Sequence, residues 1–228
     1  MESIHPVAPG AAPRGFTLAE MMVVLTIIVI VTIIALSGQG NFNKSLTVTD
    51  TAYTVALSIR QAQSYGLASR TSGVTSNAGY GIHFATAAPS AYLMFVDTSK
   101  AVYGVPSYCP VGTVGQPDAK PGNCMYDPNQ NEVSQNFAFS RGFIVSQLCG
   151  HDTGGILRCS SDSTAPLTAI DILFIRPNTN SIVTGFRSTG SLQLKDAQIK
   201  LTAPVGNGSR YICVTQVGEI SVASSACP

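Results

Sequence analysis

The chain has 228 residues, which is enough for one domain with a sizeable core or for two small domains. Thirteen Lys and Arg residues against twelve Asp and Glu residues give a formal charge of +1, so the overall charge offers no argument for binding nucleic acid or an anionic membrane. Only 11% of the residues are charged, and Gly, Ser, Thr, Ala and Val are abundant. This composition is typical of secreted β-rich domains rather than of helical enzymes.

A long apolar segment follows a Pro- and Ala-rich start. Residues 16–36 contain one charged side chain, Glu20, and are otherwise almost wholly apolar. As an α-helix rising 1.5 Å per residue, the segment would span about 32 Å, close to the ~30 Å hydrocarbon core of a bilayer. The run therefore predicts a helix that can cross a membrane once.

Two ordinary interpretations explain only part of this segment. A plain transmembrane anchor leaves Glu20 unexplained, because an acid inside such a helix costs about 2.5–3.5 kcal/mol on insertion scales. A secretory signal cut at Ala35-Leu36-Ser37 would give a mature chain that starts at Gly38. Against that reading, the preceding segment has one basic residue, Arg14, and the apolar run is long for a signal sequence.

The residues Gly15-Phe16-Thr17-Leu18-Ala19-Glu20 resemble the processing motif of type IV pilins and type II secretion pseudopilins. The resemblance implies that residues 1–15 are a leader and that a prepilin peptidase cuts between Gly15 and Phe16 on the cytoplasmic side. The new amine of Phe16 would then be N-methylated. The partners implied are the peptidase, the inner membrane before assembly, and other pilin or pseudopilin subunits through the N-terminal helix.

Cleavage would give Glu20 a physical role. It creates a free α-amine on Phe16, whose ordinary pKa is about 8. An acid and an amine on adjacent packed helices can pair in a low dielectric, where an unpaired charge is costly. The resemblance implies that Glu20 pairs with the amine of a neighbouring subunit and sets the axial stagger. In the alternative reading, Glu20 only reaches the membrane interface with its polar end.

A second helical pattern begins after two closely spaced glycines, Gly38 and Gly40, which weaken a helix by roughly 1 kcal/mol each and predict a bend. From about Leu46 to Ser69, spacings of three and four residues predict an amphipathic helix laid against a sheet. Its apolar and small residues form one stripe: Ala52, Val55, Ala56, Ile59 and Ala62. The helical pattern of residues 56–70 is similar to that of GspH/FimT-type minor pilins.

The rest of the chain carries strand patterns. Alternating apolar residues predict seven strands, near residues 79–85, 91–97, 137–148, 169–176, 181–187, 197–202 and 210–217. Asn178-Thr179-Asn180 predicts a tight hairpin, and the Pro- and Gly-rich residues 104–135 predict a long loop. The sequence near residues 186–190 and 210–220 also resembles the minor-pilin branch, although Glu219 stands where that branch often has a basic residue.

Six cysteines all lie beyond the apolar segment, and none forms a C-x-x-C pair. An even number in the part that would leave the cytoplasm favours disulfides, with buried free thiols as the alternative. Six cysteines allow 15 pairings. Pairing of sequence neighbours is our expectation, with loops that contribute on the order of 3 kcal/mol each. The three expected pairs are Cys109–Cys124, Cys149–Cys159 and Cys213–Cys227.

No pattern for catalysis stands out. Cys149, His151 and Cys159 are too few and too irregularly spaced for a zinc site, and His83 lies on the polar side of a strand pattern. Nucleophile-elbow, metalloprotease and phosphate-loop motifs are absent from the sequence. From Asp171 onward the positive charges exceed the negative ones by only two, which argues against a DNA-binding surface. We expect no enzyme activity, no metal and no cofactor.

The sequence thus predicts an α+β fold, in which a long N-terminal helix packs through its second half on a mostly antiparallel sheet. The expected parts are the leader at 1–15, the membrane and filament-core helix at 16–36, the second helical half at 37–70, and a globular β-rich domain with disulfide-tied loops at 71–228. The resemblance implies a minor pilin or pseudopilin in the inner membrane, with its C-terminal domain on the periplasmic side, and later in a filament. A major pilin, or a DNA-binding uptake or adhesion pilin, is the alternative.

Overall fold

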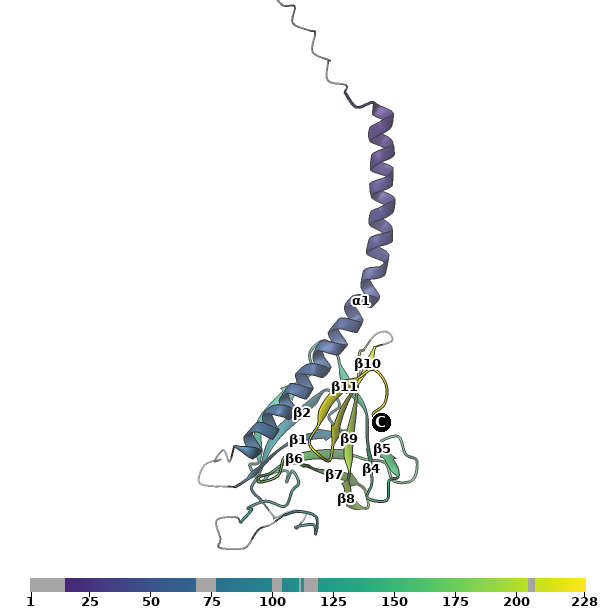
Figure 1. Cartoon of the computed structure of the whole chain (residues 1–228). Coiled ribbons are helices and arrows are strands. Elements are labelled where there is room, and N and C mark those ends of the chain that lie inside the picture. The colour runs from purple at the N-terminus through teal and green to yellow at the C-terminus, as the bar shows by residue number, and fades with distance from the viewer. Residues whose placement is uncertain (1–14, 69–76, 100–103, 111, 113–118, 205–207) are drawn as a thin grey trace, which may run out of the picture. The chain divides into compact units, whose positions relative to one another are not determined.

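A computed structural model describes residues 15–68, 77–99, 104–110, 112, 119–204 and 208–228, apart from the side chains of residues 38–45. One helix, α1 (Leu18–Leu67), opens the described chain, and eleven strands follow it there (Figure 1). Contacts between residues divide the chain into two units, Met1–Asn43 and Lys44–Pro228. The helix assignment is continuous through Gly38 and Gly40, and the bend expected there remains a prediction.

In the first unit, α1 is apolar on all sides. Leu18–Ser37 is long and apolar enough to cross a membrane, and every side chain in it is exposed. Its few hydroxyl groups are satisfied within the helix, because Thr26 donates to the carbonyl of Met22 at 2.8 Å and Thr32 to that of Ile28 at 2.7 Å. A helix that meets its own hydrogen-bonding needs in this way tolerates surroundings without water.

In the second unit, α1 is amphipathic and its inner face is buried. All five stripe residues predicted from the sequence have exposed fractions of 2% or less, and Val48 extends the stripe by one turn. Small residues let the helix lie close to the strands. At Gly66 a Cβ atom would stand 2.2 Å from the carbonyl oxygen of Phe174, so only glycine allows this approach. The predicted amphipathic helix is confirmed.

The strands form two antiparallel sheets rather than the single sheet expected. The six-stranded sheet has the order β3-β2-β1-β6-β7-β8, and the five-stranded sheet the order β11-β10-β9-β4-β5. The strand bounds are β1 (Gly79–Ala85), β2 (Ala91–Asp97), β3 (Val133–Ala138), β4 (Ile144–His151), β5 (Leu157–Cys159), β6 (Ala169–Phe174), β7 (Ser181–Arg187), β8 (Gly190–Leu194), β9 (Asp196–Thr202), β10 (Ser209–Thr215) and β11 (Ile220–Ala223).

One hydrophobic core joins the helix to both sheets. Its members come from the inner face of α1, from β1, β2 and β6 of the larger sheet, and from β4, β9 and β10 of the smaller one. Aromatic rings fill the space beside the helix, where Tyr92 stacks on Phe137 at 4.8 Å and on Phe84 at 5.3 Å. The Tyr92 hydroxyl lies 2.9 Å from that of Ser58 on α1. Helix and sheets in this unit therefore fold as one body.

The strand predictions hold with one error and three omissions. The strand predicted at residues 137–148 is wrong, because the chain turns at Ser140–Gly142 and divides the segment between β3 and β4. Arg141 and Gly142 take the left-handed conformation that makes this turn. β5, β8 and β11 were not predicted. The connection between β6 and β7 is a hairpin, but a six-residue one, since Phe174 pairs with Ser181.

Candidate functional site

The predicted processing site lies in an accessible segment before the helix. Gly15, Phe16 and Thr17 precede the first turn of α1, and the exposed fraction of Phe16 is 77%. No atom lies within 4 Å of the position that a Cβ atom on Gly15 would take. A protease could therefore bind an extended chain here without first unfolding a helix.

Glu20 lies in the first turn of α1, and local interactions at the start of the helix favour an acid at this position. The Thr17 side-chain oxygen accepts a hydrogen bond from the backbone N–H of Glu20 at 3.2 Å, which makes Thr17 the N-cap. Thr17 and Glu20 then have the spacing of a capping box, and an acid in the first turn is favoured by the helix dipole. This second role of Glu20 was not predicted, although the T-x-x-E spacing signals it.

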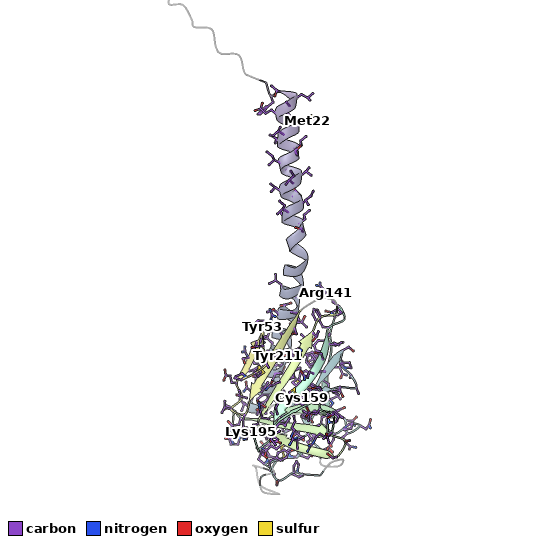
Figure 2. All side chains as sticks on the ribbon, turned by 90° about the vertical axis from the view of Figure 1, so that its right-hand side faces the viewer. Met22, Tyr53, Arg141, Cys159, Lys195 and Tyr211 are labelled. Carbon is purple, nitrogen blue, oxygen red and sulfur yellow. A yellow bond between two sulfur atoms is a disulfide. The ribbon has the colours of Figure 1, made fainter. Side chains whose placement is uncertain are left out.

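Within the described residues, the Glu20 carboxylate has no hydrogen bond or ion pair with another side chain. The large apolar side chains that follow it in the helix, from Met21 to Leu36, are exposed as well, with exposed fractions from 46% at Val24 to 67% at Ile34. Figure 2 shows these side chains, Met22 among them, projecting from the helix on all sides. The segment thus presents an acid and a long apolar surface to surroundings outside its own chain.

Comparison with known protein families matches residues 11–36 to the prokaryotic N-terminal methylation motif. No curated protein and no solved structure matches the chain. The motif supports a type IV pilin or pseudopilin subunit, which is processed by a prepilin peptidase and assembles with other pilins. The apolar helix followed by an α+β unit of antiparallel sheets is a type IV pilin-like fold. An apolar helix of this length is consistent with a membrane anchor before assembly.

The six cysteines form three disulfides, and no described cysteine is free. Cys109 is joined to Cys124, Cys149 to Cys159, and Cys213 to Cys227, which is the sequence-neighbour set. The first bridge is buried against Phe95 and Leu173, on the face of the larger sheet away from the main core. The second closes the β4–β5 hairpin, where Cys149 and Cys159 are paired residues. The third ties the C-terminal tail to β10.

Two buried carboxylates hold the segment between Cys109 and β3 against the sheet. Asp97, at the end of β2, accepts hydrogen bonds from the backbone N–H groups of Asn123 and Cys124, both at 2.8 Å. Gly122 makes this approach possible, because a Cβ atom there would stand 1.8 Å from an Asp97 oxygen. Glu132 accepts from the backbone N–H groups of Thr98, Ser99 and Asp127, at 2.7–2.9 Å.

These carboxylates show that the long loop predicted over residues 104–135 is partly buried and ends earlier than expected. Asn123, Asp127 and Glu132 have exposed fractions of 1% or less, and β3 begins within the predicted loop. Burial raises the pKa of Asp97 well above its ordinary value. Burial, followed by the nearby Asp127 carboxyl, raises the pKa of Glu132 to about 6. Sequence reasoning missed both acids, because nothing in the local pattern shows which acids a loop will cover.

Each of the two described histidines pairs with one aspartate. His83 on β1 lies 2.6 Å from an oxygen of Asp171, whose second oxygen accepts from the backbone N–H of Tyr126. His151 lies 2.8 Å from Asp196. No group of three His, Cys, Asp or Glu residues suited to a metal occurs in the described part of the chain. Cys149 and Cys159, which the sequence analysis considered together with His151 as zinc ligands, form a disulfide.

The positive charges of the C-terminal half do not gather into one patch. Lys200 lies over the ring of Tyr211, on the five-stranded sheet. Arg210 pairs with the inward-facing Leu201 and so lies on the opposite face from Lys200. In Figure 2, Lys195 lies at the lower end of the globular part, away from Tyr211. Arg176 bonds to Asn77 at the end of the other sheet.

Proposed function

We propose that this chain is a minor pilin or pseudopilin of the GspH/FimT-like kind, a structural subunit that joins or primes a type IV pilus or a type II secretion pseudopilus. The observation that carries the proposal is the methylation motif at residues 11–36, whose described part consists of an exposed segment, residues 15–17, and an apolar helix with exposed side chains. The small-residue pattern of the second helical half supports the branch assignment.

In this proposal the chain first enters the inner membrane through residues 16–36, with its C-terminal unit on the periplasmic side. A prepilin peptidase cuts after Gly15, and the amine of Phe16 is methylated. The helix then leaves the lipid for the core of a filament, where the apolar side chains pack against those of neighbouring subunits. Three disulfides in the C-terminal unit support this orientation, because disulfides persist in an oxidising compartment.

Glu20 has a specific role in the transfer from lipid to filament. A carboxylate among apolar side chains is costly unless it is paired, and the methylated amine of Phe16 on an adjacent subunit offers the opposite charge. Only a subunit at the correct axial stagger brings the two groups together. The pair therefore favours one register of helices that are otherwise uniformly apolar and could slide along one another.

The mass and N-terminal sequence of the chain, purified from cells with a prepilin peptidase, test the proposal. We expect a mature chain that begins with N-methylated Phe16. Gly15→Val should leave the leader attached, whereas the matched leader variant Ala12→Val should be processed normally. A mature start at Gly38, or an uncut wild-type chain, would contradict the proposal. The number of copies per filament then separates a scarce minor subunit from a major pilin.

A further inference from the structure

The two sheets of the second unit have four edge strands, and three of them are short or partly covered. β5 has only three residues and β11 only four. Beside β11, the C-terminal tail is tied to β10 by the Cys213–Cys227 disulfide. At the edge strand β8, Asp152 makes a bridge to Leu194. Short strands and covered edges are the usual means by which proteins prevent further strand pairing.

The fourth edge strand, β3, has none of these protections along most of its length. Its six residues, Val133–Ala138, include no charged residue and no proline, and all but Phe137 are exposed. The one irregularity, a register shift between Met94 and Phe95 of β2, leaves Ser134, the second residue of β3, without a partner in the register. From Gln135 to Ala138 the edge is regular. An edge of this kind is a template for another strand.

The register shows which backbone groups of β3 face outward. Phe139 donates its N–H to the carbonyl of Ser90, so this pair exchanges ladder hydrogen bonds. Hydrogen-bonded and non-hydrogen-bonded pairs alternate along an antiparallel ladder. Phe137 and Gln135 therefore bond to β2, while the N–H and C=O groups of Asn136 and Ala138 point away from the sheet. These two residues would bind an added strand.

A groove lies between this edge and one side of α1. It has a volume of about 380 Å³. Thr51, Thr54 and Val55 of the helix form one side, and Tyr92 and Phe137 are among the aromatic residues that line it. The stacked rings of Tyr92 and Phe137 make this part of the groove apolar and rigid. An added strand on β3 would direct every second side chain into this groove.

Asp50 supplies the charge of the groove. It is exposed, it is the one charged residue among the described lining residues, and it has no ion pair with any residue that the structure describes. The β3 edge of a second copy would bring another Asp50 and, among the described lining residues, no basic group to complement the first one. A basic residue complements it.

We propose that β3 and this groove bind an extended segment of a different protein, which pairs with Asn136 and Ala138. The segment places apolar or hydroxyl side chains in the groove at every second position and a Lys or Arg beside Asp50. The backbone hydrogen bonds supply affinity, and the groove with Asp50 supplies specificity. The inference does not depend on the proposed role in a filament, because it rests only on the second unit.

Binding of a synthetic peptide to the full chain in detergent micelles tests this inference. The probe is a labelled heptapeptide of alternating valine and threonine with one terminal lysine, and binding is followed by fluorescence anisotropy. Two further peptides carry N-methyl groups on one or the other set of alternate amides. Only one edge of an added strand faces β3, so one methylated peptide should bind about tenfold more weakly or worse, and the other should keep its affinity.

Variants of the chain locate the site. Thr54→Tyr fills the groove without altering β3 and should abolish binding, while Asn136→Ala keeps the backbone N–H and should not change the affinity. Replacing the lysine of the peptide by glutamate should weaken binding to the wild type, and Asp50→Asn should remove this difference. Slower hydrogen exchange at Asn136 and Ala138 upon binding should accompany these results.

Several results would overturn the inference. Equal losses for the two methylated peptides would exclude strand addition. Binding unaffected by Thr54→Tyr, or exchange protection confined to another strand, would place the peptide elsewhere. A dimer of the chain joined through β3, trapped by a disulfide in Asn136→Cys, would show that a second copy is the occupant. No binding of any peptide at about 1 mM would mean that the edge is not a binding site.

Discussion

Apolar and acidic side chains differ in burial and in hydrogen bonding between the two units of this chain. In the second unit, Ile59 is fully buried and the carboxylate of Glu132 accepts three backbone hydrogen bonds. In the first unit, Ile30 is 52% exposed, and the Glu20 carboxylate has no partner among the described residues. Apolar and acidic groups are thus satisfied within the chain in one unit and left for outside partners in the other.

Folding and assembly therefore depend on different parts of the chain. The second unit has its own core, disulfides and buried acids, so its stability depends on contacts inside the chain. The first unit is held as a helix by its own backbone hydrogen bonds and internally bonded hydroxyls. Substitutions in the first unit should therefore change where the protein goes and what it joins, while substitutions in the second should change how stably it folds.

The largest effect is expected at Glu20. Glu20→Gln removes the charge but keeps the shape, and it would leave the Phe16 amine of a neighbouring subunit unpaired in the filament. Removal of one partner of a buried ion pair costs about 3–5 kcal/mol, which is a factor of about a hundred or more in an equilibrium constant. Incorporation into filaments, measured by immunoblotting of sheared filaments against the cell fraction, should fall accordingly.

Glu20→Asp is the matched control, because it keeps the charge on a shorter side chain and should retain part of the incorporation. The thermal unfolding of the second unit should be the same in both variants and in the wild type. Normal incorporation of Glu20→Gln would remove the assigned role of the acid and, with it, the difference drawn between the two units.

A pair of isoleucine substitutions compares the units directly. Ile59→Ala removes a fully buried side chain from the main core and should lower the free energy of unfolding by about 2–5 kcal/mol. Ile30→Ala makes the same chemical change on the exposed half of the helix and should leave the unfolding free energy within about 0.5 kcal/mol of the wild type.

Denaturant unfolding of both variants in the same detergent, followed by far-UV circular dichroism, checks this pair. Fractionation of cells should show both proteins in the membrane, because the remaining apolar residues of the segment still suffice for anchoring. Equal losses of stability for the two variants would show that residues before Asn43 contribute to the folded unit.

Local patterns predicted those parts of the fold in which one face of an element meets the core. The stripe through Ala52 and Ile59 and the alternation at Tyr80 and Ile82 are repeated patterns, and each of these residues is buried. β5 was not predicted because a strand of three residues is too short to show an alternating pattern of apolar residues. β3 and β4 were merged because the apolar residues on both sides of the turn, Phe137, Phe139 and Phe143, continue the strand-like pattern across it, although Ser140 and Gly142 are usual turn residues.

The candidate site could be predicted from the sequence where its residues lie close together in the chain. Gly15, Phe16 and Glu20 lie within six residues of one another, inside the segment 11–36 that matches the N-terminal methylation motif, and their individual roles remain predictions. The groove beside β3 could not be predicted, because it brings together Thr54 and Phe137, which are 83 positions apart in the numbering. Asp97 and Glu132 likewise obtain hydrogen-bond partners from distant or folded-over segments, such as Asn123 and Cys124 for Asp97.

The smallest effect concerns the acids of the second unit. The pKa of Glu132 is raised to about 6 in the folded chain from an ordinary 4.5, and that of the neighbouring Asp97 is raised as well. The folded state therefore binds more protons than the unfolded state between these values, so the stability contribution of Glu132 is greatest below pH 4.5 and is lost as the pH rises through about 6. The denaturant midpoint of the full chain should be higher at pH 5 than at pH 7.

Glu132→Gln cannot titrate, so the difference between its midpoints at pH 5 and pH 7 should be smaller than in the wild type. Its stability should also be lower at both pH values, because the amide N–H₂ would face backbone donors that now bond to a carboxylate oxygen. The diagnostic quantity is therefore the pH dependence rather than the stability itself. Glu20→Gln, in the unit without a core, should keep the wild-type pH dependence of unfolding. An unchanged pH dependence in Glu132→Gln would mean that other groups titrate on unfolding, and the buried acid would then be only a structural acceptor.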